Sequence, residues 1–379
     1  MDDPRAVERL RFGYFGEVGG LLAAIKKVNR DELQKTESDV AAEELGDALW
    51  YLVAVAKALL VQPDDLAIAC VSELRSTFGE APKPATVGVT FRQIDGILEA
   101  HRDGDESLRA QRLGDLAHAA GVLALEPTEQ LQLQSAPSLA EHFGKLLAGW
   151  ARTCTAFALR VEDVAEENLR KIADRWPGAT PIYAPLLDTD PALPLYERLP
   201  RQFTMVFEER GSGANAHVVQ SLKGVFVGDR LTDNSNEQDD YRFHDVFHLA
   251  YVAHLGWSPV IRALLKRKRK SNPKQDENED GARAMIIEEA IATWIFNHAK
   301  HRDHYEHVKE GKLDYSLLKQ IRSMVDGYEV HRRPLWQWER AILAGFHVFR
   351  QLKAARCGQV VVDMEAHTVT FEALEHPVS

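Results

Sequence analysis

The chain has 379 residues, 45% of them hydrophobic, which is enough for two or three domains with substantial cores. Its formal net charge of -11 argues against sequence-independent binding to nucleic acid, because phosphate contacts need a basic surface. The longest apolar run, Leu49–Val61, is interrupted by Lys57 and is too short to cross a bilayer.

Neither the first residues nor the cysteines indicate export. MDDPRAVERL starts acidic and lacks the basic and then apolar order of a secretory signal. Cys70, Cys154 and Cys357 show neither metal nor disulfide spacing. We therefore expect a cytoplasmic protein in a reducing compartment, with no membrane partner.

The first two predicted helices, residues 5–30 and 38–60, carry acids on faces that are otherwise apolar. At about 100° per residue, Glu17 lies on such a stripe in the first helix, and Glu44 and Asp47 lie on one in the second. A separate, polar stripe of the second helix holds Asp39, Glu43, Gly46 and Lys57. Carboxylates that converge between packed helices repel one another unless a cation neutralises them. Mg²⁺ fits, because it prefers oxygen ligands and binds beside substrate phosphates.

Three helical segments contain these acids and further polar residues. They are GEVGGLLAAIKK at 16–27, AAEELGDALWYL at 41–52 and VEDVAEENLRKIADRWP at 161–177. Together they resemble the signature segments of MazG-like all-α nucleoside triphosphate pyrophosphohydrolases, which carry E-x-x-E, then E-x-x-D, and later Asn, Lys and Arg. The resemblance covers residues 1–176. It implies an all-α domain that hydrolyses a nucleoside triphosphate or related nucleotide to a monophosphate and pyrophosphate.

The resemblance implies that Glu17, Glu44 and Asp47 bind Mg²⁺, with Mn²⁺ as an alternative, and take part in catalysis. One position departs from the pattern. Gly20 stands where the family has its second acid, so that the first motif reads E-x-x-G. A site with three acids holds fewer ions or holds them more weakly. Either a ligand is recruited from elsewhere, or the protein is a nucleotide sensor with weak or no turnover.

In the third segment, Asn168, Lys171 and Arg175 match the phosphate-facing residues and share one helical face. The resemblance implies that all three bind the substrate, and that Lys171 and Arg175 also stabilise the charge that develops on the phosphates. Trp50 either stacks on a base or belongs to the core. Because the family often forms dimers, a homodimer or higher homo-oligomer is expected.

The second and third segments lie further apart than a compact four-helix unit requires. This predicts a helical insertion, or a degenerate second half, at about residues 80–150. The segment at 113–124 echoes that at 45–56, and the segment at 63–74 echoes that at 161–172, as an internal duplication would. A second half that has lost most of its acids would serve as scaffold.

Residues 177–200 hold six of the 16 prolines, which excludes a continuous helix and predicts an extended linker. Residues 201–379 are expected to form an α+β domain of unknown function. Its predicted strands are RQFTMVFEER, HVVQSLKGVFVGDRL, GQVVVDMEA and HTVTFEAL. Its predicted helices are 236–256, 280–300, 313–328 and 334–355. The fold class expected for the whole chain is therefore mainly α.

A second metal site is one interpretation of two predicted helices in this domain. His244 and His248 lie one turn apart, with Asp245 between them. Glu288 and Glu289 are adjacent on a helix that is apolar almost all round, so one of them could complete a two-histidine, one-carboxylate site. The protein would then be bifunctional. The other interpretation is that these groups hydrogen-bond to one another and tie two buried helices together.

Two charged segments of this domain are also candidates for binding. KRKRKSNPK at 266–274 is followed at once by QDENEDG, which predicts a mobile charged loop rather than a polyanion site. GDRLTDNSNEQDD at 228–240 either cradles a phosphate or metal or is an ordinary polar loop.

Overall fold

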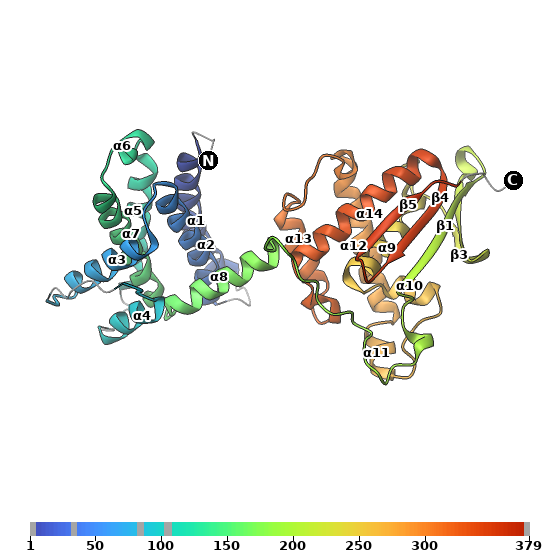
Figure 1. Cartoon of the computed structure of the whole chain (residues 1–379), viewed down its shortest axis with the longest axis horizontal. Helices are drawn as coiled ribbons and strands as arrows, with labels where there is room; N and C mark the ends of the chain where they lie inside the picture. Colours follow the sequence, from blue (N-terminus) through green and yellow to red (C-terminus); the bar gives the residue numbers. More distant parts are fainter. Residues whose placement is uncertain (1–4, 32–35, 82–86, 102–107, 375–379) are drawn as a thin grey trace. The chain divides into compact units, whose positions relative to one another are not determined.

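The computed structural model describes residues 5–31, 36–81, 87–101 and 108–374. The chain divides into two compact units, residues 1–172 and 173–379, each with its own hydrophobic core (Figure 1). The first unit is all-α, and the second combines helices with one antiparallel sheet. The fold class predicted from the sequence is confirmed.

Helices make up the regular structure of the first unit within its described residues. They are α1 (Ala6–Asp31), α2 (Glu37–Ala58), α3 (Pro63–Thr77), α4 (Phe91–Ala100), α5 (Arg109–Leu125), α6 (Thr128–Gln132), α7 (Ala136–Ala156) and α8 (Val161–Arg175). α1 packs against α2 and α5, while α7 packs against α2, α3 and α5. The buried Trp150 of α7 donates its indole N–H to the carbonyl of Leu45 at 2.9 Å, which ties α7 to α2. Among the described helices of the whole chain, none is long and apolar enough to span a bilayer.

Local sequence determines where two helices of the first unit begin. α2 starts in a capping box, in which the Thr36 side chain accepts from the Asp39 N–H and the Asp39 carboxylate accepts from the Thr36 N–H. Thr90 and Gln93 form the same arrangement at α4. The start of α2 helps fix which face it presents, and hence the direction of its acids.

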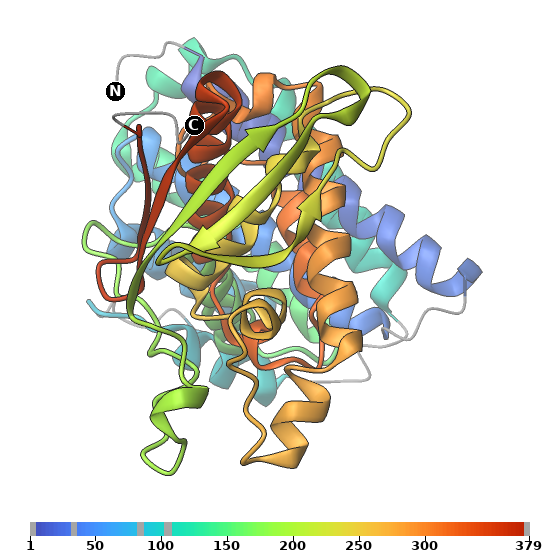
Figure 2. The same cartoon turned by 90° about the vertical axis from the view of Figure 1, so that its right-hand side faces the viewer.

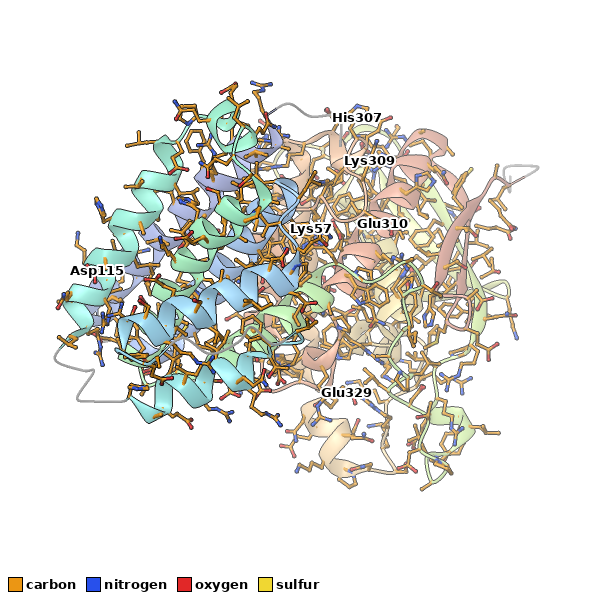
Figure 3. The ribbon with its side chains drawn as sticks, turned by 60° about the vertical axis from the view of Figure 1, so that its left-hand side comes forward. Lys57, Asp115, His307, Lys309, Glu310 and Glu329 are labelled. Carbon is orange, nitrogen blue, oxygen red and sulfur yellow. The ribbon has the colours of Figure 1, made fainter. Side chains whose placement is uncertain are left out.

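Region 80–150, predicted as an insertion or a degenerate half, contains α4 to α7 and contributes to the same core as α1 and α2. Leu116 and Leu123 of α5 are buried. Asp115, which the predicted echo aligns with Asp47, is exposed on α5 and points outward (Figure 3). These helices therefore contribute to the core, Asp115 takes no part in the acidic site, and their origin by insertion or duplication remains a prediction.

The second unit is built on a five-stranded antiparallel sheet with helices behind one face (Figure 2). The strands are β1 (Gln202–Arg210), β2 (His217–Leu222), β3 (Val225–Leu231), β4 (Cys357–Asp363) and β5 (Thr368–Glu372). Their order is β3-β2-β1-β4-β5, so that the central β1 pairs with its neighbour β2 and with the distant β4. Each strand coincides with a segment predicted to be extended.

Alternate residues of the central strands face the helices. Met205 and Phe207 of β1 and Val360 and Val362 of β4 are fully buried, whereas the residues between them are half-buried. The α-helices are α9 (Asp245–Leu255), α10 (Pro259–Leu264), α11 (Pro273–Asn278), α12 (Ala282–Lys300), α13 (Tyr315–Met324) and α14 (Leu335–Ala355). Short 3₁₀ turns occur at η2 (Leu195–Glu197), η3 (Gly213–Asn215), η4 (Tyr241–Phe243), η5 (Asp303–Tyr305) and η6 (Glu329–Arg332). α9 and α14 pack on β4 and β5.

The division between the units falls inside α8, whereas the sequence suggested a boundary in the Pro-rich segment that follows. The last turn of α8 belongs to the second unit, where Asp174 accepts two hydrogen bonds from Arg322, at 2.7 and 2.8 Å. These contacts explain why the helix is shared between the two units.

The Pro-rich residues 177–200 also belong to the second unit. Asp188, which is 1% exposed, accepts hydrogen bonds from Arg201 at 2.6 Å, from Arg262 at 3.0 Å and from the N–H of Leu199 at 2.8 Å. These contacts anchor the segment to the unit that follows it.

The charged segment 266–274 is not the mobile loop that the sequence predicted. Arg269 is 1% exposed, and its guanidinium lies 2.7 Å from both Asp280 and Glu329. The acidic run after this segment provides Asp280, which is fully buried. Opposite charges that seemed to cancel along the chain instead form an ion pair inside the fold.

In segment 228–240, acids pair with a cation of the same unit. Arg242 lies 2.6 Å from Asp233 and 2.8 Å from Asp240. Carboxylates neutralised in this way favour the interpretation of an ordinary polar loop.

Candidate functional site

Acids of two neighbouring helices converge in the first unit. Glu17 lies on α1, Glu44 and Asp47 lie on α2, and all three side chains are half-buried. Burial raises the pKa of Glu17, and the negative charges of Asp47 and Glu44 raise it further. The three acids predicted to bind a cation are thus near enough for their charges to interact, but among the described residues the group whose ligand atoms all lie within 4.8 Å of one another is in the second unit.

Gly20 leaves room for one of these carboxylates. A Cβ atom added at residue 20 would lie 2.6 Å from Oε2 of Glu44, closer than real Cβ contacts allow. The position at which the first motif lacks an acid is therefore in contact with the carboxylate of Glu44.

α8 contributes two of the predicted phosphate-binding residues. Asn168 donates its amide N–H to Asp47 Oδ1 at 3.0 Å, and Lys171 forms an ion pair with Asp47 Oδ2. α8 approaches α2 closely here, because a Cβ atom at Gly46 would lie 3.1 Å from Cβ of Asn168. Glu43, placed on a polar stripe by the sequence, is itself half-buried, 3.8 Å from Lys171 Nζ. The positive charge of Lys171 partly offsets the rise in the pKa of Glu17, so Lys171 acts on this acid as well as on Asp47.

Arg175 does not join this group. It is 1% exposed and belongs to the second unit, where its guanidinium donates to Glu339 at 2.6 and 3.2 Å and to the carbonyl of Leu313 at 2.8 Å. Its predicted contact with phosphate is therefore replaced by a buried ion pair. Helical spacing placed it on the face of Asn168 and Lys171, but could not reveal that the last turn packs on other partners.

Two aromatic residues of α2 lie beside the acids in the sequence. Trp50 is 44% exposed, so it is not a core residue, and its ring meets that of Tyr51 edge to face at 4.9 Å. Burial raises the pKa of Tyr51, and the charges of Glu17 and Asp47 raise it further. Tyr51 was missed as a site residue, although it follows Asp47 by one helical turn and so shares its face.

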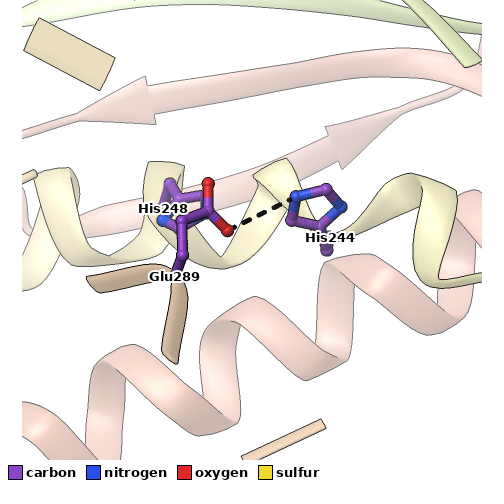
Figure 4. A group of neighbouring side chains, drawn as sticks. All are labelled: His244, His248 and Glu289. Carbon is purple, nitrogen blue, oxygen red and sulfur yellow. Dashed lines mark ion pairs between the residues drawn. The ribbon is translucent and has the colours of Figure 1, made fainter. Parts of the chain in front are cut away.

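A second group of side chains lies in the second unit, where His244 caps the start of α9 and His248 follows one turn later. One ligand atom each from His244, His248 and Glu289 lie within 4.8 Å of one another. Figure 4 shows the carboxylate of Glu289, from α12, facing the imidazole of His244. Of the two adjacent acids predicted as ligands, Glu289 is the one that meets both histidines.

Glu288 and Asp245 have different positions in this group. The fully buried carboxylate of Glu288 accepts hydrogen bonds from His248 Nδ1 and from the N–H of Val260, both at 2.8 Å. Asp245 lies 3.2 Å from His244 Nε2 and also accepts from the amide of Gln220. Both acids therefore lie beside the histidines without belonging to the three-residue set.

The charges of this second group are strongly coupled. Burial opposes protonation of His248, but the carboxylates of Glu288 and Glu289 raise its pKa well above the usual range. Burial likewise opposes ionisation of Glu289, but His248 and His244 lower its pKa to about 2. The acids of the group thus favour a positive charge at the centre.

Comparison with known proteins gives one match. A family model described as the MazG C-terminal domain matches residues 184–375, and no curated protein and no solved structure matches the chain. The match supports the MazG family that the motifs predicted, but it lies in the half for which the sequence predicted no family. That half is therefore no longer unassigned, and the MazG-like assignment of residues 1–176 remains a prediction.

Proposed function

Since the chain belongs to the MazG family through its C-terminal domain, we propose that its first unit hydrolyses a nucleoside triphosphate, or a related nucleotide, to a monophosphate and pyrophosphate. One observation carries this proposal. The charges of Glu44 and Asp47 on one helix act on Glu17 of another, and a third helix brings Lys171 and Asn168 to Asp47. Acids for a cation thus lie next to a cationic side chain for phosphates.

The acids fit a hard divalent ion. All three offer carboxylate oxygens, which Mg²⁺ prefers and Mn²⁺ also accepts. The pKa of Glu17 is raised first by burial and then by the like charges of Asp47 and Glu44, which a divalent ion would offset. When bound, the ion supplies this countercharge and lowers the pKa of a coordinated water.

Two side chains of α8 act on the carboxylate of Asp47: one orients it and the other neutralises it. Asn168, which is 7% exposed, fixes one oxygen of Asp47 through its amide. Lys171 neutralises the other oxygen, and with a divalent ion at the acids its ammonium group can pair with phosphate oxygens instead. The exposed ring of Trp50 offers a surface on which a base can stack.

The reaction that fits these roles is the attack of water on the α-phosphorus. The bond between the α-phosphorus and the bridging oxygen breaks, so that pyrophosphate leaves and the monophosphate retains the oxygen of water. The acids would hold the divalent ion near the phosphates, and Lys171 stabilises the negative charge that develops on the phosphates.

A panel of ribo- and deoxyribonucleoside triphosphates, incubated with the full chain and Mg²⁺, tests the proposal. We expect pyrophosphate and a monophosphate from at least one of them, separated by ion-exchange chromatography. Asp47→Asn and Glu17→Gln should each slow release by about 100-fold or more. Glu166→Gln, which alters an exposed acid on α8, is the matched control. Failure of every nucleotide to yield a monophosphate, or full activity of Asp47→Asn, would rule the proposal out.

A nucleotide sensor is the second candidate, favoured by Gly20 in place of an acid. A site with one ligand fewer can still bind a nucleotide through a divalent ion while turning it over slowly. Calorimetric titration distinguishes the two candidates. Mg²⁺-dependent binding that needs Asp47, without any product after prolonged incubation, supports the sensor, whereas stoichiometric turnover excludes it.

A further inference from the structure

We propose that the second unit binds one divalent transition metal ion through His244 Nε2, His248 Nε2 and the carboxylate of Glu289. This site is independent of the acids in the first unit and of the activity proposed for them. It takes an ion that accepts imidazole nitrogen, of which Zn²⁺ is the representative, rather than Mg²⁺.

The distances suit a single ion. Glu289 Oε2 lies 3.4 Å from His248 Nε2 and 3.7 Å from His244 Nε2. A tetrahedral ion with bonds of about 2.0–2.1 Å separates its ligand atoms by about 3.3–3.4 Å. The ligand atoms of all three residues lie within 4.8 Å of one another, so adjustment of the side chains brings them into one coordination sphere.

The histidines are held in the orientation that coordination needs. The backbone carbonyl of Tyr241 lies 2.9 Å from His244 Nδ1 and can only accept, so this nitrogen carries a hydrogen and Nε2 is the nitrogen that faces Glu289. The carboxylate of Glu288 does the same for His248 Nδ1, at 2.8 Å. A hydrogen bond from the nitrogen remote from the metal is the usual arrangement around histidine ligands.

One ligand atom lacks a hydrogen bond. His248 is fully buried, and its Nε2 lies 3.4 Å from the carboxylate of Glu289 without forming a hydrogen bond with it. A buried ring nitrogen without a hydrogen bond is costly for an ordinary core histidine. A metal ion between this nitrogen and the carboxylate would remove the cost.

The site is open on one side. The side chain of Glu289 is 42% exposed, whereas His248 is enclosed. Three protein ligands leave a fourth position of a tetrahedral ion for water or a small ligand, as in sites that do chemistry.

Titration of the full chain, freed of metal by chelation, tests the site. We expect one equivalent of Zn²⁺ to bind by calorimetry, and Co²⁺ to give visible absorption that Zn²⁺ abolishes. His244→Ala and Glu289→Gln should weaken Zn²⁺ binding by more than the roughly 10–100-fold expected when an outer partner such as Glu288 is lost. Glu288→Gln should fall within that range.

Two controls make the result specific. His347→Ala removes an exposed histidine of α14, and Asp47→Asn alters the other site, so neither should change binding of Zn²⁺. Circular dichroism of each variant establishes that it is folded, and Glu289→Gln, at a partly exposed position, is the substitution least disruptive to folding. Absence of saturable Zn²⁺ and Co²⁺ binding, or unchanged affinity in both His244→Ala and Glu289→Gln, would overturn the proposal.

Discussion

Gly20 has two opposing effects on α1. Alanine favours a helix over glycine by about 1 kcal/mol, so Gly20→Ala should raise the melting temperature. Its Cβ atom would lie 2.6 Å from Oε2 of Glu44, however, so that carboxylate must move. We expect the Mg²⁺ concentration for half-maximal activity to rise about fivefold, equivalent to about 1 kcal/mol.

Gly19→Ala is the matched control for this change. It lies on the same helix, but nothing comes within 4 Å of a Cβ atom there. Both variants should be stabilised, and only Gly20→Ala should need more Mg²⁺. The same Mg²⁺ dependence in both would contradict the contact between residue 20 and Glu44.

His254 makes the stability of the second unit depend on pH. Burial, with the nearby charges of His367 and Arg340, lowers its pKa to about 3, and Tyr183 lies 3.0 Å from its Nδ1. In the unfolded chain it titrates near 6.5. The unfolded state therefore binds more protons below that pH, and stability falls as the pH decreases toward 3.

This effect amounts to about 2 kcal/mol between pH 7 and pH 5. His254→Asn cannot titrate, so denaturant unfolding should show a smaller loss of stability for the variant over the same interval. The comparison with the native chain cancels contributions from other groups. Parallel pH profiles for the two proteins would show that His254 is not buried in its neutral form.

At the scale of elements, the last turn of α8 is structural rather than catalytic. Glu339 accepts from Arg175 and also from the N–H groups of Gly311 and Leu313, at 2.9 and 2.7 Å. Arg175→Met leaves this carboxylate buried without its charged partner, which should cost about 3–5 kcal/mol of stability. The rate of pyrophosphate release should stay unchanged wherever the variant is folded.

A double-mutant cycle with Glu339→Gln separates the pair from its surroundings. Groups in one ion pair are coupled, so the double variant should be more stable than the sum of the single changes by about 1–3 kcal/mol. Loss of pyrophosphate release in Arg175→Met with an unaltered unfolding curve would restore the phosphate-binding role.

The elements whose sequences have a clear hydrophobic period could be predicted, and the elements without such a period could not. Strands β1 and β4 alternate between buried and partly exposed residues, and predicted helices 280–300 and 334–355 match α12 and α14 almost to their ends. Predicted helix 236–256 begins at residue 245 instead, because Asp240 adopts a left-handed conformation (φ 68°) that a helix excludes. α10 and α11, of six residues each, are too short to show any period.

At the scale of the whole molecule, the periodicity of a single helix predicts some features of the sites, and packing between helices determines the others. Periodicity gave the face on which Glu17 and Asp47 lie, and hence that these acids are half-buried. It could not show that Gly20 touches Glu44, or that α8 passes from one unit to the other, because both depend on packing between helices. The choice of Glu289 over Glu288 required the same knowledge.

The order of the strands also constrains how the second unit is made during synthesis. β1 pairs with β2, which follows it after a few residues. The other edge of β1 stays unpaired until β4, more than a hundred residues further along the chain, has been synthesised. Until residues 357–363 leave the ribosome, the unpaired backbone of β1 and the apolar side chains beneath it can attach to other nascent chains. We therefore expect chaperones to protect this part of the chain during translation.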